Sequence, residues 1–292
     1  MADVNELISD IDSLPTFPSA SAQLVDMLGN NDVSIEDVAE IIRIDEALSI
    51  AVLRYANSAA FGTPDRKFDL RESIVRLGRS TLTKIVLEQQ AATVFKGGCE
   101  AFDLTRERLW RGAIGGAIAA ESFAAEHNPD LKDLAFVTGL VRDVGKLVLD
   151  RKYGSDYASS VHDKLRIECT YLEAERDAFG TDHAVVGAAL CRHWKLPERI
   201  ASAVECHHCP PTDGEKCDEL CDYVHAGDII ALWSGISIGS DGLRYELADH
   251  VKTSLRISRR AAERAIASMW DSVGRIEETL GLQTDDTKRS VA

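Results

Sequence analysis

Hydrophobic residues recur at helical spacing along most of the chain. Between residues 135 and 150 they lie three or four positions apart, at Val137, Leu140, Val141, Val144, Leu147 and Val148. This spacing places them on one face of a helix over 135–150, and we expect that face to be buried. The strict alternation of apolar and polar residues that marks a half-buried strand is nearly absent. The pattern therefore predicts an all-α protein, folded as a multi-helical bundle.

Polar residues mark helix starts in the first hundred residues. Ser34, Asp45 and Asp69 each stand where a side-chain oxygen can accept the free N–H groups of a first helical turn, and apolar residues at helical spacing follow each of them. Gly29 and Gly78 fall where such helices would end. This part of the chain is predicted to form a compact group of about five short helices.

The helical pattern resumes after residue 105. The most apolar window, 113–125, is rich in glycine and alanine, and we expect it to be a tightly packed internal helix. A helix pair is predicted at about 165–179 and 183–194, and a short amphipathic piece after Gly274.

Paired glycines at Gly97 and Gly98 predict a joint in the chain, because they end a helix and loosen the backbone. We therefore expect an N-terminal helical subdomain over residues 1–98 and a second helical subdomain over 99–282. Residues 283–292 are polar, have little to bury and are expected to be a disordered tail.

Composition and charge exclude several classes of protein. The chain is 45% hydrophobic and 28% charged, as in soluble globular proteins. No apolar run approaches the ~20 residues of a membrane span, so no membrane association is expected. The net charge of −15 argues against a nucleic-acid surface, which needs clustered cations. One basic group is interpreted as a solvated helix face, at Arg256, Arg259, Arg260 and Arg264.

The N-terminal segment and the cysteines bear on the compartment. The first ten residues are acidic and lack the basic and apolar regions of a signal peptide, so we expect a cytoplasmic protein. Seven cysteines, an odd number, fit reduced thiols better than a disulfide framework.

Several phrases together resemble a known family. They are LPTFP at 14–18, YANSAAFG at 55–62, SIVRLG at 73–78 and the segment at 135–150. This set resembles the HDOD domain, the HD-related output domain of bacterial signalling proteins, over roughly residues 10 to 240. The resemblance implies a divergent member of the HD phosphohydrolase superfamily, in which an N-terminal helical subdomain packs on an HD-like bundle.

In that superfamily a His-Asp pair and further ligands on separate helices bind metal. The resemblance places the first family His at Gly112, the paired His at Arg142, its Asp at Asp143 and, more loosely, the closing Asp at Asp228. Two of the four ligand positions, Gly112 and Arg142, are therefore degenerate. Arginine cannot lose its proton to become a ligand. We expect Arg142 to pair with Asp143 or Asp228 and so replace the charge of the metal.

The resemblance leaves one possible residual metal site. Superfamily members with two metals use histidines that match His183, His207 and His208, together with the shared Asp143. These residues could bind one divalent metal, iron, manganese or zinc. The alternative is that the histidines serve only packing and hydrogen bonding.

A cysteine cluster offers a second zinc hypothesis. Cys206 and Cys209 are followed by Cys217 and Cys221, a clustering that zinc sites use. The spacing between the two pairs is shorter than in a usual zinc ribbon, so free thiols are the favoured interpretation.

Two functions follow from the resemblance. The favoured one is a non-catalytic signal-transduction or regulatory module that binds a signalling protein or a small nucleotide, with the groove between the subdomains as the first place to look. Asn57 is expected either to help set that junction or to cap a helix. The alternative is a metal-dependent phosphohydrolase acting on nucleotides or cyclic dinucleotides. The sequence identifies neither the partner nor the oligomeric state.

Overall fold

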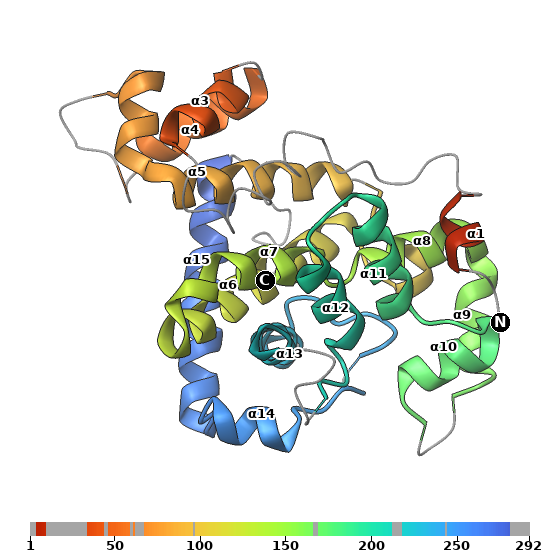
Figure 1. Ribbon diagram of the computed structural model, residues 1–292. Helices are drawn as coiled ribbons and strands as arrows, with labels where there is room; N and C mark the ends of the chain where they lie inside the picture. The colour runs from red at the N-terminus through yellow and green to blue at the C-terminus, as the bar shows by residue number, and fades with distance from the viewer. Residues whose placement is uncertain are drawn as a thin grey trace, which may run out of the picture.

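The computed structural model describes residues 4–9, 34–43, 46–58, 61, 67–95, 97–165, 169–211, 218–242 and 244–280. In these residues the regular structure is helical, apart from one isolated bridge between Cys99 and Leu104 (Figure 1). The prediction of an all-α protein is confirmed. None of the helices in these ranges has the length and apolar character that a membrane crossing requires. The LPTFP phrase at 14–18 and the tail at 283–292 lie outside the described residues.

The N-terminal half contributes α1 (Val4–Ser9), α3 (Ile35–Arg43), α4 (Glu46–Ala56) and α5 (Leu70–Val94). Helices α3 and α4 pack on each other and on α5, whereas α1 packs against α8 and α11 much further along the chain. Asp69 caps α5 as predicted: its Oδ1 accepts from the Glu72 amide over 2.8 Å, and the Glu72 side chain accepts from the Asp69 amide. The subdomain boundary at residue 98 itself stays a prediction.

Asn57 joins the end of α4 to the start of α5. Its Nδ2 donates to the carbonyl of Leu53 over 2.8 Å, within α4, and to the carbonyl of Phe68 over 3.2 Å. Its Oδ1 accepts from the amide of Phe68 over 2.8 Å. Asn57 therefore both caps α4 and sets the angle at which the chain enters α5.

Gly78 bends α5. Its backbone has φ 71° and ψ 166°, which is not helical, although helical residues lie on both sides of it. The predicted helix end at Gly78 is thus a sharp kink, and a second helical stretch continues to Val94. Only glycine populates such a positive φ at low cost.

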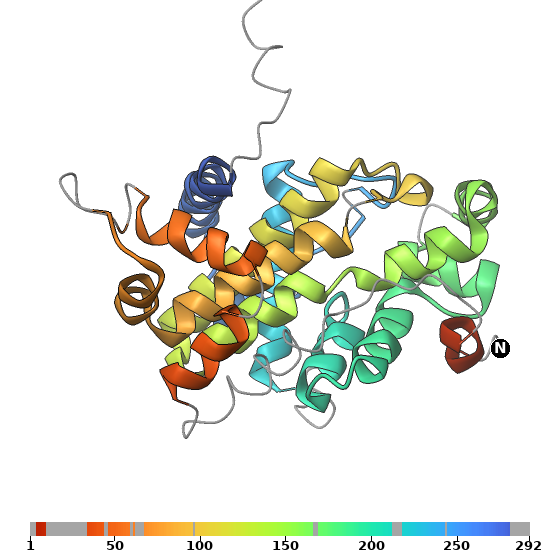
Figure 2. The ribbon, with the colours of Figure 1, turned by 90° about the horizontal axis from the view of Figure 1, so that it is seen from above.

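The second half forms a bundle around α6 (Arg106–His127), which packs against α7 (Lys132–Val141), α13 (Glu219–Ser234) and α15 (Arg259–Leu280). Its remaining helices are η1 (Glu100–Phe102), η2 (Pro129–Leu131), α8 (Val144–Tyr153), α9 (Ser155–His162), α10 (Tyr171–Phe179), α11 (His183–His193), α12 (Glu198–Cys206) and α14 (Asp249–Ser254). The predicted internal helix at 113–125 is confirmed, because most of its residues are buried within α6. Helix α5 lies across α6 and α7 (Figures 1 and 2).

The predicted helix over 135–150 is interrupted. Helix α7 ends at Val141 and α8 begins at Val144, so Arg142 and Asp143 form a turn between them. Residues 135–149 are all buried, so the segment has no solvent-facing side. A Cβ at Gly145 would lie 1.9 Å from the carbonyl oxygen of His183, which shows how closely α8 approaches α11. The break therefore places two charged residues in the middle of the bundle.

Helix α15 is longer than predicted. Instead of a short piece after Gly274, one helix runs from Arg259 to Leu280 and buries Ala262, Met269, Val273 and Ile276. These residues share one helical face, and that periodicity was the missed signal. The arginines at 259, 260 and 264 are exposed, as predicted. The helix runs along α6 and reaches α4, and so connects both halves of the molecule (Figure 1).

Candidate metal centre

Arg142 lies at the centre of the bundle, with a side chain that is 1% exposed. Its Nε donates to Oδ1 of Asp228 over 2.7 Å, and it lies 3.3 Å from Oδ2 of Asp143. The remaining nitrogens donate to the carbonyl oxygens of Gly139 at 2.8 Å and Gly112 at 3.2 Å. Arg142 therefore pairs with both carboxylates that the sequence proposed for it, and it also binds the backbones of α6 and α7.

Two glycines of α6 explain how a guanidinium fits here. A Cβ at Gly116 would lie 2.3 Å from Nη1 of Arg142, so any other residue would displace the side chain. A Cβ at Gly112 would lie 2.3 Å from Cβ of Ser237. The space that a histidine at position 112 would need is thus occupied by the segment after α13.

Lys146 adds a second buried cation, which the sequence analysis did not identify as a site residue. Its Nζ lies 2.9 Å from Oδ1 of Asp143 and 2.7 Å from Oδ2 of Asp241. Burial alone would raise the pKa of Asp143, but Lys146 and Arg142 together hold that pKa well below its usual range. Asp143 is therefore a carboxylate at neutral pH. The hint in the sequence was a lysine within an otherwise apolar helical face.

Three histidines converge on Asp143 from two helices. His183 is the first residue of α11, after the N-cap Asp182, while His207 and His208 follow α12. Oδ1 of Asp143 lies 3.8 Å from Nε2 of His183 and 3.9 Å from Nε2 of His207. One ligand atom from each of Asp143, His183, His207 and His208 falls within 4.8 Å of the other three. The structure thus brings together the four residues of the proposed residual site.

The outer nitrogens of two of these rings are held in place. Nδ1 of His183 bonds to Oε2 of Glu175 over 2.7 Å, and Nδ1 of His207 bonds to the carbonyl oxygen of Val204 over 2.6 Å. Because a carbonyl can only accept, Nδ1 of His207 carries the proton, and its Nε2 presents a lone pair to the cluster. Such outer hydrogen bonds are the usual way to orient a metal-binding imidazole.

Burial of the ring favours ligation by His207. Burial lowers the pKa of His207 to about 4, so the ring is neutral at pH 7. Its Nε2 has no hydrogen-bond partner among the described residues, although the ring is buried. For His183, burial acts to lower the pKa, but the charge of Glu175 reverses this and raises it.

His208 completes the cluster. Its Nε2 lies 2.9 Å from Nε2 of His183, and its ring stacks on Tyr245 with centroids 3.8 Å apart. Its Nδ1 lies 3.4 Å from Oδ2 of Asp228 without a hydrogen bond. Asp228 thus contacts Arg142 and His208 but stands outside the group of four.

The donor set fits a divalent first-row metal. Three imidazoles and one carboxylate suit iron, manganese or zinc, and the unpartnered Nε2 of His207 is a buried polar atom that such an ion would satisfy. Lys146 competes for Asp143, since its ammonium already neutralises the carboxylate.

Little space remains for a substrate. The cavity beside Asp143, Lys146, His208 and Asp228 has a volume of about 10 Å³. This volume is about that of one water molecule, whereas ligand pockets span about 300–1,000 Å³.

The cysteine cluster is only partly described. Cys206 is half-buried, Cys209 is exposed and Cys221 is buried, and none of the three belongs to the group that could hold a metal. Cys217 lies outside the described residues, so the zinc hypothesis for these cysteines stays a prediction.

With this geometry established, comparisons with known proteins identify the family. The family model described as the HDOD domain matches residues 14–210. The chain belongs to the HDOD domain family. Among curated proteins, an uncharacterized protein of Treponema pallidum (strain Nichols) is 29% identical over 220 residues. The match covers 72% of this chain but 40% of that protein, so this HDOD chain spans less than half of the relative's length.

Solved structures agree with the assignment. An HDOD domain protein of unknown function from Geobacter sulfurreducens is 25% identical, with a TM-score of 0.72 and 95% coverage of both chains. A proposed phosphohydrolase from Shewanella amazonensis SB2B is 26% identical, with a TM-score of 0.67 and coverage of 94% of this chain and 97% of that one. A proposed signal transduction protein from Marinobacter aquaeolei VT8, at 18% identity and a TM-score of 0.69, shares the fold; the match covers 96% of this chain and 65% of that one.

Proposed function

We propose that this HDOD protein is a non-catalytic regulatory module that acts by binding a signalling partner or a small ligand. The observation that carries the proposal is the buried pairing of Arg142 with Asp228 and Asp143. A permanent cation stands where the HD resemblance would place a metal ligand, and it uses both remaining carboxylates of that site.

The chemistry of phosphoester hydrolysis supports this conclusion. Hydrolysis in metal enzymes needs an open coordination position for water and room for the substrate phosphate. Arg142 offers no lone pair, and the ~10 Å³ cavity beside Asp143 and Asp228 admits no phosphoester. A guanidinium here can hold α6, α7 and α13 together without chemistry.

A hydrolysis assay tests the proposal. The purified chain is loaded in turn with manganese, iron or zinc and incubated with bis(p-nitrophenyl) phosphate, while bound metal is measured in the same sample. We expect no turnover above that of the free metal. Turnover that His207→Ala abolishes, and that substitution of the exposed His193 leaves intact, would overturn it.

A specific observation keeps the phosphohydrolase as the second candidate. The cluster of Asp143, His183, His207 and His208 presents an unpartnered imidazole nitrogen and an ionised carboxylate in one place. A divalent metal bound there would supply a Lewis acid and an activated water. The protein itself would orient the ligands through Glu175 and the carbonyl oxygen of Val204. The residual site therefore has the donors for chemistry but lacks a visible substrate space.

A further inference from the structure

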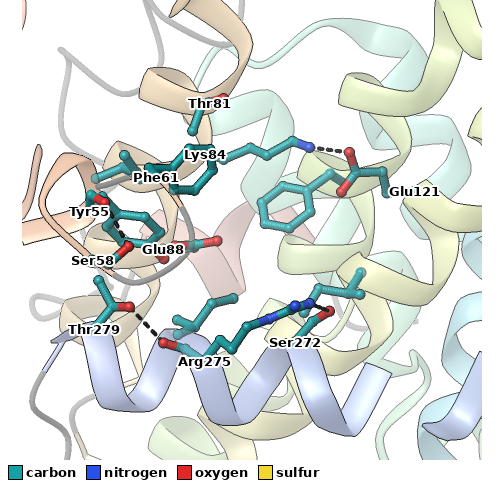
Figure 3. A pocket seen from close by; sticks show the side chains of 14 residues that line it. Tyr55, Ser58, Phe61, Thr81, Lys84, Glu88, Glu121, Ser272, Arg275 and Thr279 are labelled. Carbon is teal, nitrogen blue, oxygen red and sulfur yellow. Dashed lines mark hydrogen bonds and ion pairs between the residues drawn. The ribbon is translucent and has the colours of Figure 1, made fainter. Parts of the chain in front are cut away.

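A second cavity lies outside the histidine cluster, where the N-terminal helices meet the bundle and α15 (Figure 3). Its volume is about 420 Å³, within the range of small-molecule sites. The walls are mainly apolar, formed by Tyr55 of α4, Ile85 of α5, Ile118 of α6, Phe136 of α7 and Ile276 of α15. A molecule held here would touch helices from both halves of the chain.

The cavity contains a buried acid. Glu88 is 4% exposed, and its Oε2 accepts a hydrogen bond from the hydroxyl of Tyr55. Burial raises the pKa of Glu88 to about 7. Near neutral pH a large fraction of this carboxyl group is therefore uncharged and can donate its own proton to a ligand oxygen.

The two cations of the cavity differ in how they are paired. Lys84 forms an ion pair with Glu121, both partly exposed at one side of the cavity. Arg275, on α15, donates to Oγ of Ser272 over 3.0 Å, and no carboxylate of the described residues lies within ion-pair distance of it. Figure 3 shows Arg275 and Ser272 across the cavity from Lys84 and Glu121. Arg275 thus keeps free N–H donors beside an apolar space.

The local charge contrasts with that of the whole protein. The chain carries a net charge of −15, yet this cavity holds two cations, Lys84 and Arg275, beside Glu121 and the partly neutral Glu88. An anionic ligand would be repelled by most of the surface and accepted here. Guanidinium groups bind carboxylate and phosphate with paired hydrogen bonds, which suits the free donors of Arg275.

We propose that this cavity binds a small amphipathic anion, whose aromatic body packs between Tyr55 and Phe136 and whose carboxylate or phosphate pairs with Arg275. The proposal rests on the regulatory function in one respect, namely that the ligand would be the signal. Because the ligand bridges α4, α5 and α15, its binding stabilises one arrangement of the N-terminal helices on the bundle. The binding itself is independent of any partner.

Two fluorescent dyes test the proposal on the full chain. 8-Anilino-1-naphthalenesulfonate combines an aromatic body with an anion, and N-phenyl-1-naphthylamine has the same body without the charge. We expect saturable binding of both dyes with a stoichiometry of one. Arg275→Gln is expected to lower the affinity for the anionic dye about five- to tenfold and to leave the affinity for the neutral dye unchanged, because only the ion pair is lost.

Two control variants locate the binding. Arg264→Gln, which removes another exposed arginine of α15, should change neither affinity. Thr81→Trp, at the cavity wall, should lower the affinity for both dyes because the larger side chain fills the cavity. Since Thr81 is only partly buried, the variant should still fold, and circular dichroism checks this. Unchanged binding in Thr81→Trp, or equal loss of both dyes in Arg275→Gln, would overturn the proposal.

Competition distinguishes the two kinds of anion. Displacement of the anionic dye by adenosine 5′-monophosphate would assign a phosphate ligand, and displacement by naphthalene-2-carboxylate a carboxylate. Displacement by neither would refute the ligand class. Phosphodiester hydrolysis with intact dye binding would refute the non-catalytic function but leave this inference standing, so the two failures remain distinguishable.

Discussion

Nε of Arg142 donates to Oδ1 of Asp228 over 2.7 Å between side chains that are 1% and 3% exposed. This ion pair connects the turn between α7 and α8 to the middle of α13. The other guanidinium nitrogens donate to carbonyl oxygens of α6 and α7. One side chain thus holds three helices together at the place where the HD resemblance puts a metal ligand.

Removing Arg142 should strongly destabilise the fold. Arg142→Ala leaves Asp228 and one side of Asp143 buried without their partner, and we expect a loss of about 3 to 5 kcal/mol in the free energy of unfolding. Urea denaturation followed by circular dichroism measures the change. The double variant Arg142→Met/Asp228→Leu should lose less, because it leaves no unpaired charge at position 228. Equal unfolding midpoints for Arg142→Ala and the wild type would contradict the buried pairing.

Gly112 should not tolerate a side chain while Ser237 is in place. A Cβ at position 112 would lie 2.3 Å from Cβ of Ser237 and 2.4 Å from its Oγ. We expect Gly112→Ala to lower the free energy of unfolding by about 1 to 3 kcal/mol through overpacking. In a Ser237→Gly background, which removes the two clashing atoms, the same substitution should cost clearly less. A double-mutant cycle from thermal unfolding gives this coupling, and strict additivity would refute the steric explanation.

The same clash bears on restoring the metal site. The double variant Arg142→His/Gly112→His should not bind metal tightly at the restored positions, because the histidine at 112 has no room. Metal content measured after dialysis, with the wild type as reference, checks this expectation. Binding of one additional metal equivalent by the double variant would contradict it.

Glu88 should make stability depend on pH. Its pKa is about 7 in the folded protein, against an ordinary value of 4.5, so between these values the folded state holds a proton that the unfolded state has lost. Stability is therefore lost as the pH rises from about 4.5 to 7. Glu88→Gln should remove this loss. Between pH 5 and pH 8, the free energy of unfolding should therefore fall by about 2 to 3 kcal/mol more in the wild type than in the variant.

The measurement is urea denaturation of both proteins at the two pH values. Glu278→Gln, which alters an exposed carboxylate of α15, is the matched control and should follow the wild type. Parallel pH profiles for Glu88→Gln and the wild type would show that Glu88 is ionised at both pH values.

Two glycines should respond to alanine in opposite ways. A Cβ at either Gly78 or Gly274 meets nothing within 4 Å, so only the backbone decides the outcome. Gly78 has φ 71°, so alanine there should lower the free energy of unfolding by about 1 to 2 kcal/mol. Gly274 lies inside α15, where alanine should raise the free energy of unfolding by about 0.5 to 1 kcal/mol. Thermal unfolding of both variants checks the signs, and stabilisation by Gly78→Ala would rule out the kinked backbone.

The helical spacing and the capping residues were sufficient to predict most of the fold. Asp69 with Glu72, and Asp182 before His183, begin helices where local hydrogen bonding predicts them. The errors fell where local signals conflict with packing. The break at Arg142 and Asp143 was missed because the apolar positions on both sides keep helical spacing, and the uninterrupted course of α15 was missed because Gly274 resembles a stop signal.

The sequence by itself determined the helical class and, through the family resemblance, the absence of histidine at Gly112 and Arg142. It also named Asp143, His183, His207 and His208 as possible companions. Only the tertiary structure decided that Arg142 binds Asp228, that Lys146 and Asp241 join the same buried network, and that Tyr55, Glu88 and Arg275 share one cavity. The physical reason is distance along the chain. Helix formation depends on residues a few positions apart, whereas a buried charge pairs with a residue that folding brings in from a distant part of the chain.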